Sequence, residues 1–294
     1  MKILMTGASG LVGKELTSIL KAERNEVIPL VRNRNQKGIF WDPENNEIDL
    51  SSMEGSNAVV HLAGESIAAK RWTESFKDKI MQSRVRGTSL LAEGLKKLKS
   101  PPKKFLSASA VGYYADAGNQ KILECSPPDD SFLSRVCVAW ENAAYLASPI
   151  VPVTTCRIGV VLSKNGGALE KMLTPFRLGL GGKMGDGQQY MPWIDLNDLC
   201  RAFAFLINQP KAEGAFNLTA PEPVTQEEFS KSLSKILNRP NFVHTPKWLL
   251  KATLGEMAEE LLLKSMRAYP DQLLKRGFKF EYDELEKSLR HWIN

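Results

Sequence analysis

The first thirteen residues place three glycines directly after a short apolar run. Residues 3–5 are apolar, as in a buried strand, and Gly7, Gly10 and Gly13 follow before an amphipathic pattern that begins near Leu11. In a strand–turn–helix unit, the first two glycines let the backbone approach a pyrophosphate, and the helix N-terminus attracts that anion. Gly13 lets the helix pack close to the strand. The spacing predicts a dinucleotide-binding turn, with a ligand-free glycine turn as the alternative.

Strand and helix patterns alternate through the first half of the chain. Apolar runs typical of strands occupy residues 26–31, 39–41, 58–62, 105–109 and 153–162, and helical patterns occupy residues 73–98 and 130–146. This alternation predicts an α/β fold with a Rossmann-like, doubly wound, mostly parallel sheet. Ligands of such sheets lie at the carboxyl ends of the strands.

The second half of the chain has a different pattern. Residues 166–167 and 179–187 are glycine-rich, and helical patterns follow at residues 195–208, 225–237, 247–264 and 283–292. We expect an NADP-binding domain over residues 1–164 and a smaller, mainly helical C-terminal lobe over residues 165–294. Residues 216–218 are apolar enough to return to the main sheet.

Composition excludes several classes of protein. The hydrophobic fraction of 43% suits a globular chain, and the net charge of +6 comes from scattered basic residues, which disfavours nucleic acid as a partner. The four cysteines form no C-x-x-C pair, so no metal site is expected. No apolar run reaches the roughly 18 residues of a membrane span. We therefore expect a cytoplasmic protein with no membrane partner.

The end of the second predicted strand bears on the choice of cofactor. An acidic residue there would bind the ribose 2′-hydroxyl of NAD, whereas an arginine accommodates the 2′-phosphate of NADP. Arg32 directly follows the strand, Arg34 lies nearby, and the segment contains no acid. This favours NADP. The alternative is that both arginines are solvated loop charges.

Several motifs together resemble a known superfamily, the extended short-chain dehydrogenases/reductases, and within it the NAD(P)-dependent sugar-nucleotide epimerase and dehydratase group. The matching segments are Thr6-Gly-Ala-Ser-Gly-Leu-Val-Gly13, Ala58-Val-Val-His-Leu-Ala-Gly64 and Ser107-Ala-Ser-Ala-Val-Gly-Tyr-Tyr114. Further segments resemble a narrower branch of "epimerase family proteins" of unassigned activity: Ser83-Arg-Val-Arg-Gly-Thr88, Val136-Cys-Val-Ala-Trp-Glu141, Pro175-Phe-Arg-Leu-Gly-Leu-Gly-Gly182, Pro192-Trp-Ile194 and Phe216-Asn-Leu-Thr-Ala-Pro221.

The resemblance implies a set of residues around NADP. These are Gly7, Ser9, Gly10, Leu11, Val12, Arg32, Leu62, Ala63, Gly64, Lys79, Arg84, Ser107, Cys137 and Arg157. Arg84 stands where the superfamily often has asparagine, and it could bind a phosphate. Lys79 and Arg84 could instead belong to a solvated helix face, and Cys137 to the core.

The catalytic pair of the superfamily is missing. That pair is Y-x-x-x-K, and no tyrosine of this chain has a lysine four residues later. The resemblance places Leu133 and Cys137 at the two positions. Ser109 resembles the active-site serine, and Tyr113 and Tyr114 could reach the same place, so we take these three as the catalytic candidates. Capping of its loop is the alternative role of Ser109.

The glycine-rich segment 185–194 resembles a substrate loop, in which Gln189 and Trp193 could bind a sugar or nucleotide or simply pack. We interpret the chain as an NADP-binding oxidoreductase or nucleotide-sugar epimerase whose partner is a small molecule, a nucleotide sugar or another carbonyl compound. The missing pair keeps open a non-catalytic NADP-binding sensor or regulatory module.

Overall fold

The computed structural model describes residues 1–293 as two compact units. The first comprises Met1–Ala110, Arg135–Arg157 and Cys200–Phe216, and the second comprises Val111–Ser134, Ile158–Leu199 and the chain from Asn217 onward. Each unit is thus assembled from three separate stretches of chain. A single boundary between residues 164 and 165 stays a prediction.

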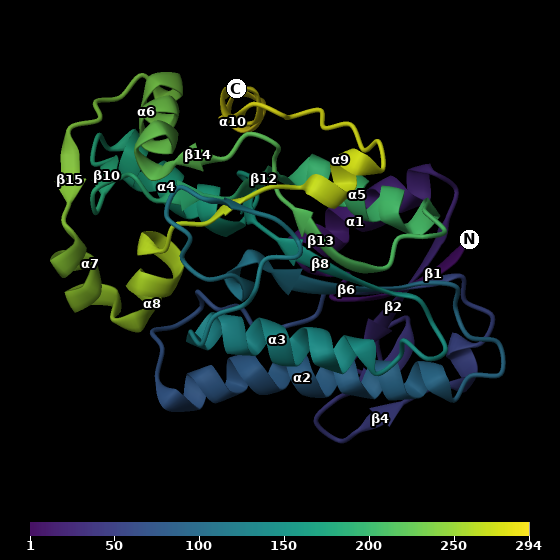
Figure 1. The fold of residues 1–294 in the computed structure, drawn as a ribbon. Helices are drawn as coiled ribbons and strands as arrows, with labels where there is room; N and C mark the ends of the chain where they lie inside the picture. The colour runs from purple at the N-terminus through teal and green to yellow at the C-terminus, as the bar shows by residue number, and fades with distance from the viewer. Residues whose placement is uncertain (294) are drawn as a thin grey trace. The chain divides into compact units, whose positions relative to one another are not determined.

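The first unit is built around an eight-stranded sheet with the order β13-β8-β6-β5-β1-β2-β3-β4 (Figure 1). The strands are β1 (Lys2–Thr6), β2 (Glu26–Val31), β3 (Ile39–Asp42), β4 (Glu47–Ile48), β5 (Ala58–His61), β6 (Phe105–Ala110), β8 (Val153–Ile158) and β13 (Gly214–Leu218). The pairs β1–β2, β1–β5, β2–β3 and β5–β6 are parallel, and β3–β4 is antiparallel. The carboxyl ends of β1, β2, β5 and β6 therefore meet along one edge.

Helices cover both faces of this sheet. Figure 1 shows α2 (Glu74–Lys96) and α3 (Phe132–Tyr145) along one face, and α1 (Leu11–Ala22) and α5 (Leu196–Asn208) along the other. The central strand β1 is buried between them: Ile3, Leu4 and Met5 have no exposed surface. Helix α2 begins where its N-cap Thr73 accepts a hydrogen bond from the backbone N–H of Phe76.

The second unit consists mainly of helices with four two-stranded pairs: β9–β12, β10–β15, β7–β16 and β11–β14. Its elements are η2 (Val111–Tyr113), β7 (Lys121–Ile122), β9 (Val160–Leu162), α4 (Gly167–Arg177), β10 (Gly182–Met184), β11 (Tyr190–Met191), β12 (Trp193–Asp195), β14 (Val224–Thr225), α6 (Gln226–Leu237), β15 (Val243–Thr245), α7 (Lys247–Leu254), α8 (Glu256–Ala258), the π-helical η3 (Glu259–Leu263), β16 (Arg267–Ala268), α9 (Asp271–Lys275) and α10 (Leu285–Ile293).

The predicted fold class is confirmed, and so is the return of residues 216–218 to the main sheet as part of β13. Three elements differ from expectation. The single strand predicted over residues 153–162 is divided into β8, which belongs to the main sheet, and β9, which pairs with β12. Helix α4 forms where the glycines at 166–167 indicated only a loop. The single helix predicted over residues 247–264 is broken at Gly255, whose φ of 62° leaves the helical region. Within residues 1–293, no helix is both long and apolar enough to cross a membrane.

Candidate nucleotide site and active site

The turn after β1 depends on a glycine that L-residues cannot replace without strain. Gly7 has a φ of 69°, and a Cβ atom at this position would lie 3.0 Å from both the backbone N of Ala63 and the carbonyl carbon of Leu62. The backbone N–H of Gly10 donates to the carbonyl oxygen of Gly7 at 3.0 Å. The glycine turn therefore lies directly against the loop that follows β5, as the sequence predicts for a nucleotide site.

The N-terminus of α1 is open. Gly10 is its N-cap, with φ of −75° and no side-chain capping bond, and Gly10 and Ser9 are exposed. Leu11 and Val12 form the half-buried first turn, whose N–H groups point out of the helix end. A Cβ on Gly13 would lie 2.2 Å from the Gly7 carbonyl oxygen, so Gly13 allows the helix to pack onto the turn. This end of the helix can hold a phosphate through N–H groups and the helix dipole.

Arg32 lies at the carboxyl end of β2 and is exposed. Among residues 1–293 no carboxylate lies within ion-pair distance of it. The pKa of half-buried Asp42 is lowered mainly by a hydrogen bond from Asn45, with a small contribution from the charge of Arg32. Arg34 is engaged instead, since it pairs with Glu47 at 2.5 Å and stacks 3.6 Å from the Phe40 ring centre. Arg32 is thus the arginine available to an anionic ligand.

A chain of buried hydrogen bonds joins the ends of β1 and β5 to α2. The Thr6 hydroxyl oxygen accepts from the backbone N–H groups of Leu62 and Ala63 at 3.1 and 3.2 Å and lies 2.7 Å from His61 Nδ1. His61 Nε2 lies 2.9 Å from the Thr88 hydroxyl, which donates to the Arg84 carbonyl at 2.6 Å.

These contacts fix the protonation of His61. The Thr88 proton is used on a carbonyl, so Thr88 accepts from Nε2–H, and Nδ1 accepts the Thr6 proton. Burial, with a smaller contribution from the charge of Arg84, lowers the pKa of His61 to about 3. His61 is therefore a neutral spacer that positions Leu62 and Ala63, and it takes no part in proton transfer at neutral pH.

Arg84 crosses the loop after β5. Its Nη1 donates to the carbonyl oxygens of Glu65 and Ile80 at 3.0 and 3.2 Å, and its Cζ would lie 3.4 Å from a Cβ on Gly64. Its Nε and Nη2 donate to no residue of the described chain, and the guanidinium lies 4.9 Å from the centre of the Trp140 ring. Lys79, by contrast, is exposed and pairs with Glu65 at 3.2 Å.

Cys137, which the motif resemblance aligns with the superfamily's lysine, is a neutral thiol. Burial, followed by the charge of Glu141, raises the pKa of Cys137 to about 11, although Arg84 opposes this shift. The pKa of Arg84 is lowered by burial, an effect that Cys137 and Glu65 oppose. Cys137 cannot replace a lysine charge; the cation beside it comes from α2.

Ser109 belongs to a buried polar cluster at the end of β6. Its hydroxyl donates to Glu141 Oε1 at 2.7 Å, and the same carboxylate accepts from Arg157 Nε at 2.8 Å and Nη2 at 2.9 Å. The side chains of Glu141 and Arg157 are only 7% and 5% exposed. We call Ser109, Glu141 and Arg157 the β6 cluster. Its internal bonds already use the Ser109 proton and the Nε–Nη2 edge of the Arg157 guanidinium.

The remaining candidates of the first unit are less open. Ser107 is buried, and its hydroxyl donates to the carbonyl oxygen of Ala108 at 3.3 Å.

Within residues 1–293 no group of three or more His, Cys, Asp or Glu side chains could hold a metal ion.

Tyr113, Tyr114 and Leu133 belong to the second unit. The Tyr114 hydroxyl donates to Asn217 Oδ1 at 2.6 Å, and Tyr114 is 1% exposed. Tyr113 is half-buried and packs edge-to-face on Tyr114. The Leu133 side chain lies beside Gly112, 3.2 Å from where a Cβ would stand. Of the two tyrosines, only Tyr113 has accessible surface to offer a substrate.

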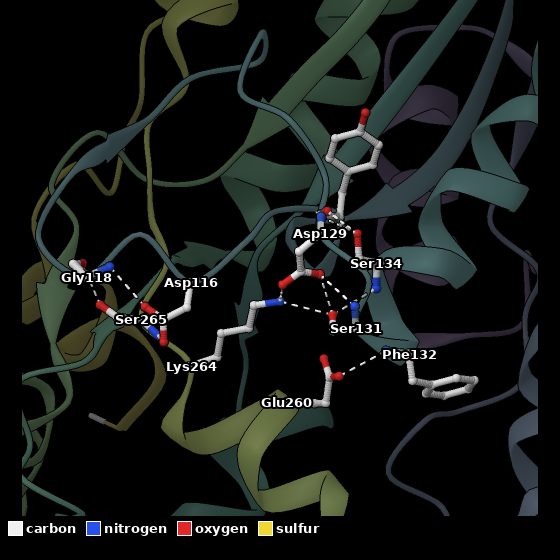
Figure 2. A network of polar contacts seen from close by, with 10 residues as sticks. Asp116, Gly118, Asp129, Ser131, Phe132, Ser134, Glu260, Lys264 and Ser265 are labelled. Carbon is white, nitrogen blue, oxygen red and sulfur yellow. Dashed lines mark hydrogen bonds and ion pairs between the residues drawn. The ribbon is translucent and has the colours of Figure 1, made fainter.

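The chain around Tyr113 is held by the network in Figure 2. The Ser134 hydroxyl donates to the Tyr113 carbonyl at 2.7 Å, and Lys264 donates to Asp129 at 2.8 Å. Glu260 of η3 accepts from the first backbone N–H of α3, at Phe132, at 3.1 Å, and burial raises the pKa of Glu260. The C-terminal segment thus caps the helix that begins with Phe132 and Leu133.

Both candidates in the glycine-rich segment 185–194 are packed. Gln189 donates through Nε2 to the carbonyl oxygens of Met184 and Leu262, and Trp193 donates to the carbonyl of Glu222 at 3.0 Å. Trp193 is 1% exposed. The packing alternative therefore describes these two side chains in this structure.

Comparison with known proteins places the chain in a family. A family model described as the NAD dependent epimerase/dehydratase family matches residues 3–219. The chain belongs to this family. A second model, a domain of unknown function (DUF1731), matches residues 245–292, which contain the η3 segment of Figure 2.

Family members align with nearly the whole chain. Epimerase family protein Mb2239 of Mycobacterium bovis is 37% identical over 98% of this chain and 96% of its own length, and human epimerase family protein SDR39U1 is 34% identical over 100% of both. The crystal structure of human SDR39U1 (isoform 2) with NADPH superimposes with a TM-score of 0.93 over 99% of each chain, at 34% identity. The resemblance drawn from the motifs is confirmed.

Glu141 was not among the site residues predicted from the sequence. Ser109 and Arg157 lie 32 and 16 residues from it, and no local spacing signals their meeting. The roles of Thr6 and Thr88 around His61 were missed for the same reason. The sequence signal for Glu141 was its place as the one acid at the end of the apolar segment Val136-Cys-Val-Ala-Trp-Glu141.

Proposed function

We propose that the first unit binds NADPH along the carboxyl ends of β1, β2 and β5. The observation that carries this proposal is the uncapped N-terminus of α1 above a glycine turn, with Arg32 lacking a carboxylate partner at the end of the next strand. Both features suit phosphate groups. The crystallised human relative with NADPH, at 34% identity over 99% of this chain, supports the same assignment.

Each binding residue has a separate task in this proposal. The first turn of α1 would hold the pyrophosphate through backbone N–H groups, and Arg32 the 2′-phosphate. Leu62 and Ala63 would support the adenosine half, held in place by Thr6 and His61. Arg84, with Nε and Nη2 directed at no protein acceptor, would face the ribose or a substrate anion.

We further propose oxidoreductase or epimerase chemistry on a small carbonyl compound, with a nucleotide sugar as the candidate class. When bound, the nicotinamide group supplies hydride exchange with a substrate carbon. Ser109 would orient the substrate oxygen, and this requires its proton to leave Glu141 or its lone pairs to accept from the substrate. Tyr113, the half-buried tyrosine of the pair, would supply a proton.

A second candidate function is NADPH binding without turnover. It is favoured by one specific observation: the proton of Ser109 is donated to Glu141, which is also bound by Arg157. The sequence also lacks Y-x-x-x-K, so the lysine that would lower the pKa of a catalytic tyrosine is missing.

Titration calorimetry with NADPH and NADH tests the first proposal. NADPH should bind the unmodified protein more tightly than NADH, and Gly10→Val should abolish binding. The substitution needs only a small backbone shift, since Gly10 has a negative φ and a Cβ would meet a single atom, the Gly7 oxygen, at a tight 3.3 Å. Circular dichroism of this variant should therefore be unchanged. Equal affinity for both nucleotides, or unchanged affinity in Gly10→Val, would reject the assignment.

A further inference from the structure

Three large apolar side chains protrude together from one end of the second unit. Phe242, Leu178 and Leu180 are 78%, 70% and 62% exposed, the highest values among the large hydrophobic residues apart from Trp248. They are close in space because Gly182 pairs with Val243 in the parallel ladder of β10 and β15. A Cβ on Gly179 would also lie 3.5 Å from Pro240. We call Leu178, Leu180 and Phe242 the Phe242 patch.

Two arginines flank this patch. Arg177 precedes Leu178 at the end of α4, and Arg239 lies three residues before Phe242; both are exposed. Across the described chain neither guanidinium is within ion-pair distance of a carboxylate, whereas the lysines of the neighbouring helices are paired, Lys231 with Glu227 and Lys235 with Glu286. Exposed apolar groups beside unneutralised cations are the pattern of a surface that meets an anionic apolar partner.

We propose that the Phe242 patch docks the protein reversibly on an anionic lipid bilayer. The leucines and the phenylalanine would enter the headgroup region, while Arg177 and Arg239 bind lipid phosphates or carboxylates. The earlier expectation of no membrane partner rested on the lack of a spanning run, which does not bear on a surface of this kind.

The observations favour a bilayer over a protein partner. Three side chains cover far less than the roughly 800 Å² per partner of a stable protein interface. A symmetric contact between two copies would bring the four arginines of two patches into one small interface, and like charges would oppose it. A fluid bilayer needs no complementary shape, so a small protruding patch is enough for weak attachment.

Co-sedimentation with sucrose-loaded vesicles tests this proposal. Vesicles of phosphatidylcholine with 30% phosphatidylserine should bind the protein about 25-fold better than phosphatidylcholine alone, at about fivefold per arginine. Arg177→Glu/Arg239→Glu should remove this preference, and Leu180→Asp/Phe242→Asp should reduce binding to both vesicles about tenfold or more. Thermal melting should confirm that both variants fold, since all four side chains are exposed.

Matched controls separate the patch from net charge and from general apolarity. Lys97→Glu/Lys103→Glu makes the same change of net charge in the first unit, and Ile150→Asp removes another exposed apolar side chain; both should bind like the unmodified protein. Equal binding to both vesicles, no binding, or equal losses in the controls would overturn the proposal. Concentration-dependent dimerisation abolished by Leu180→Asp/Phe242→Asp in ultracentrifugation would also overturn it, and would assign the patch to a protein contact.

Discussion

The glycine turn after β1 and the β6 cluster lie in the same unit, but their polar groups are satisfied in opposite ways. At the turn, the N-terminus of α1 is uncapped and Arg32 has no carboxylate partner. In the β6 cluster, Ser109, Glu141 and Arg157 bind one another and are buried. The first arrangement leaves its donors open to solvent or to a ligand, while the second bonds internally. Ligand binding and any chemistry can therefore be perturbed independently.

The largest expected effect is that of Glu141→Ala, which tests the β6 cluster. Removing this carboxylate leaves the Arg157 guanidinium buried without its counter-ion, and we expect the free energy of unfolding to fall by about 3–5 kcal/mol. Urea denaturation measures this loss. Glu93→Ala, which breaks an exposed pair with Lys96 on α2, should cost less than about 1 kcal/mol. Similar losses in the two variants would contradict a closed, charge-coupled cluster.

Substitution of Arg32, near the glycine turn, should change the affinity for NADPH rather than the free energy of unfolding. Arg32→Glu removes a phosphate partner and adds a repulsive charge, so NADPH binding should weaken by about 2–4 kcal/mol. Calorimetry measures the affinity, and the urea midpoint should not move. Lys37→Glu, an equal charge change in the same exposed loop, should have a much smaller effect. If both variants weaken binding equally, Arg32 has no specific role.

Ser109→Ala tests whether the two regions are independent. It leaves the Glu141 carboxylate without one donor, and we expect a loss of stability of about 1.5–3 kcal/mol. NADPH affinity should stay within about twofold, since the hydrogen bonds of Ser109 lie within the cluster. Any NADPH-dependent turnover found on a substrate panel should fall about 100-fold. An activity indifferent to this substitution would remove Ser109 from the catalytic candidates.

A pH-dependent effect concerns His61, which lies beside the glycine turn through its contact with Thr6. Its folded pKa of about 3 lies below the ordinary value of 6.5, so the unfolded chain binds a proton that the folded chain does not. Stability should therefore fall between pH 6.5 and 3, by about 1.4 kcal/mol per pH unit from this group. Urea denaturation at pH 7, 6 and 5 should show a shallower decline for His61→Gln. Parallel declines would mean that His61 is protonated in the folded protein.

The two regions also differ in how far sequence could predict them. The glycine turn was predictable because strand, glycines and helix are contiguous, and the required backbone conformation at Gly7 restricts which residues can stand there. The β6 cluster joins β6, α3 and β8, and its key acid was not predicted. Glu141 meets Ser109 only because the sheet order places β6 beside β8 under α3.

Two helix boundaries were predicted wrongly from local glycines and apolar spacing, and each error has a physical reason. Gly166 and Gly167 indicated a loop, yet Gly166 serves as the N-cap of α4, and Pro175 is accommodated inside the helix. At residues 247–264 the apolar spacing indicated one helix. Gly255 has φ of 62° and ψ of −140°, which separates α7 from α8 and leads into the π-helical turn of η3.

The central place of β1 in the sheet has a consequence for how the protein is made. Its neighbour β2 follows within 31 residues, but its other neighbour, β5, ends only at His61. At a synthesis rate of about 5–20 residues per second, roughly 2–6 s separate the completion of these two strands. During that interval the Thr6 hydroxyl lacks its donors, the N–H groups of Leu62 and Ala63, and the glycine turn has no β5 loop to pack against. We expect nascent chains arrested before residue 58 to show no NADPH binding, although every glycine of the turn has already been synthesised.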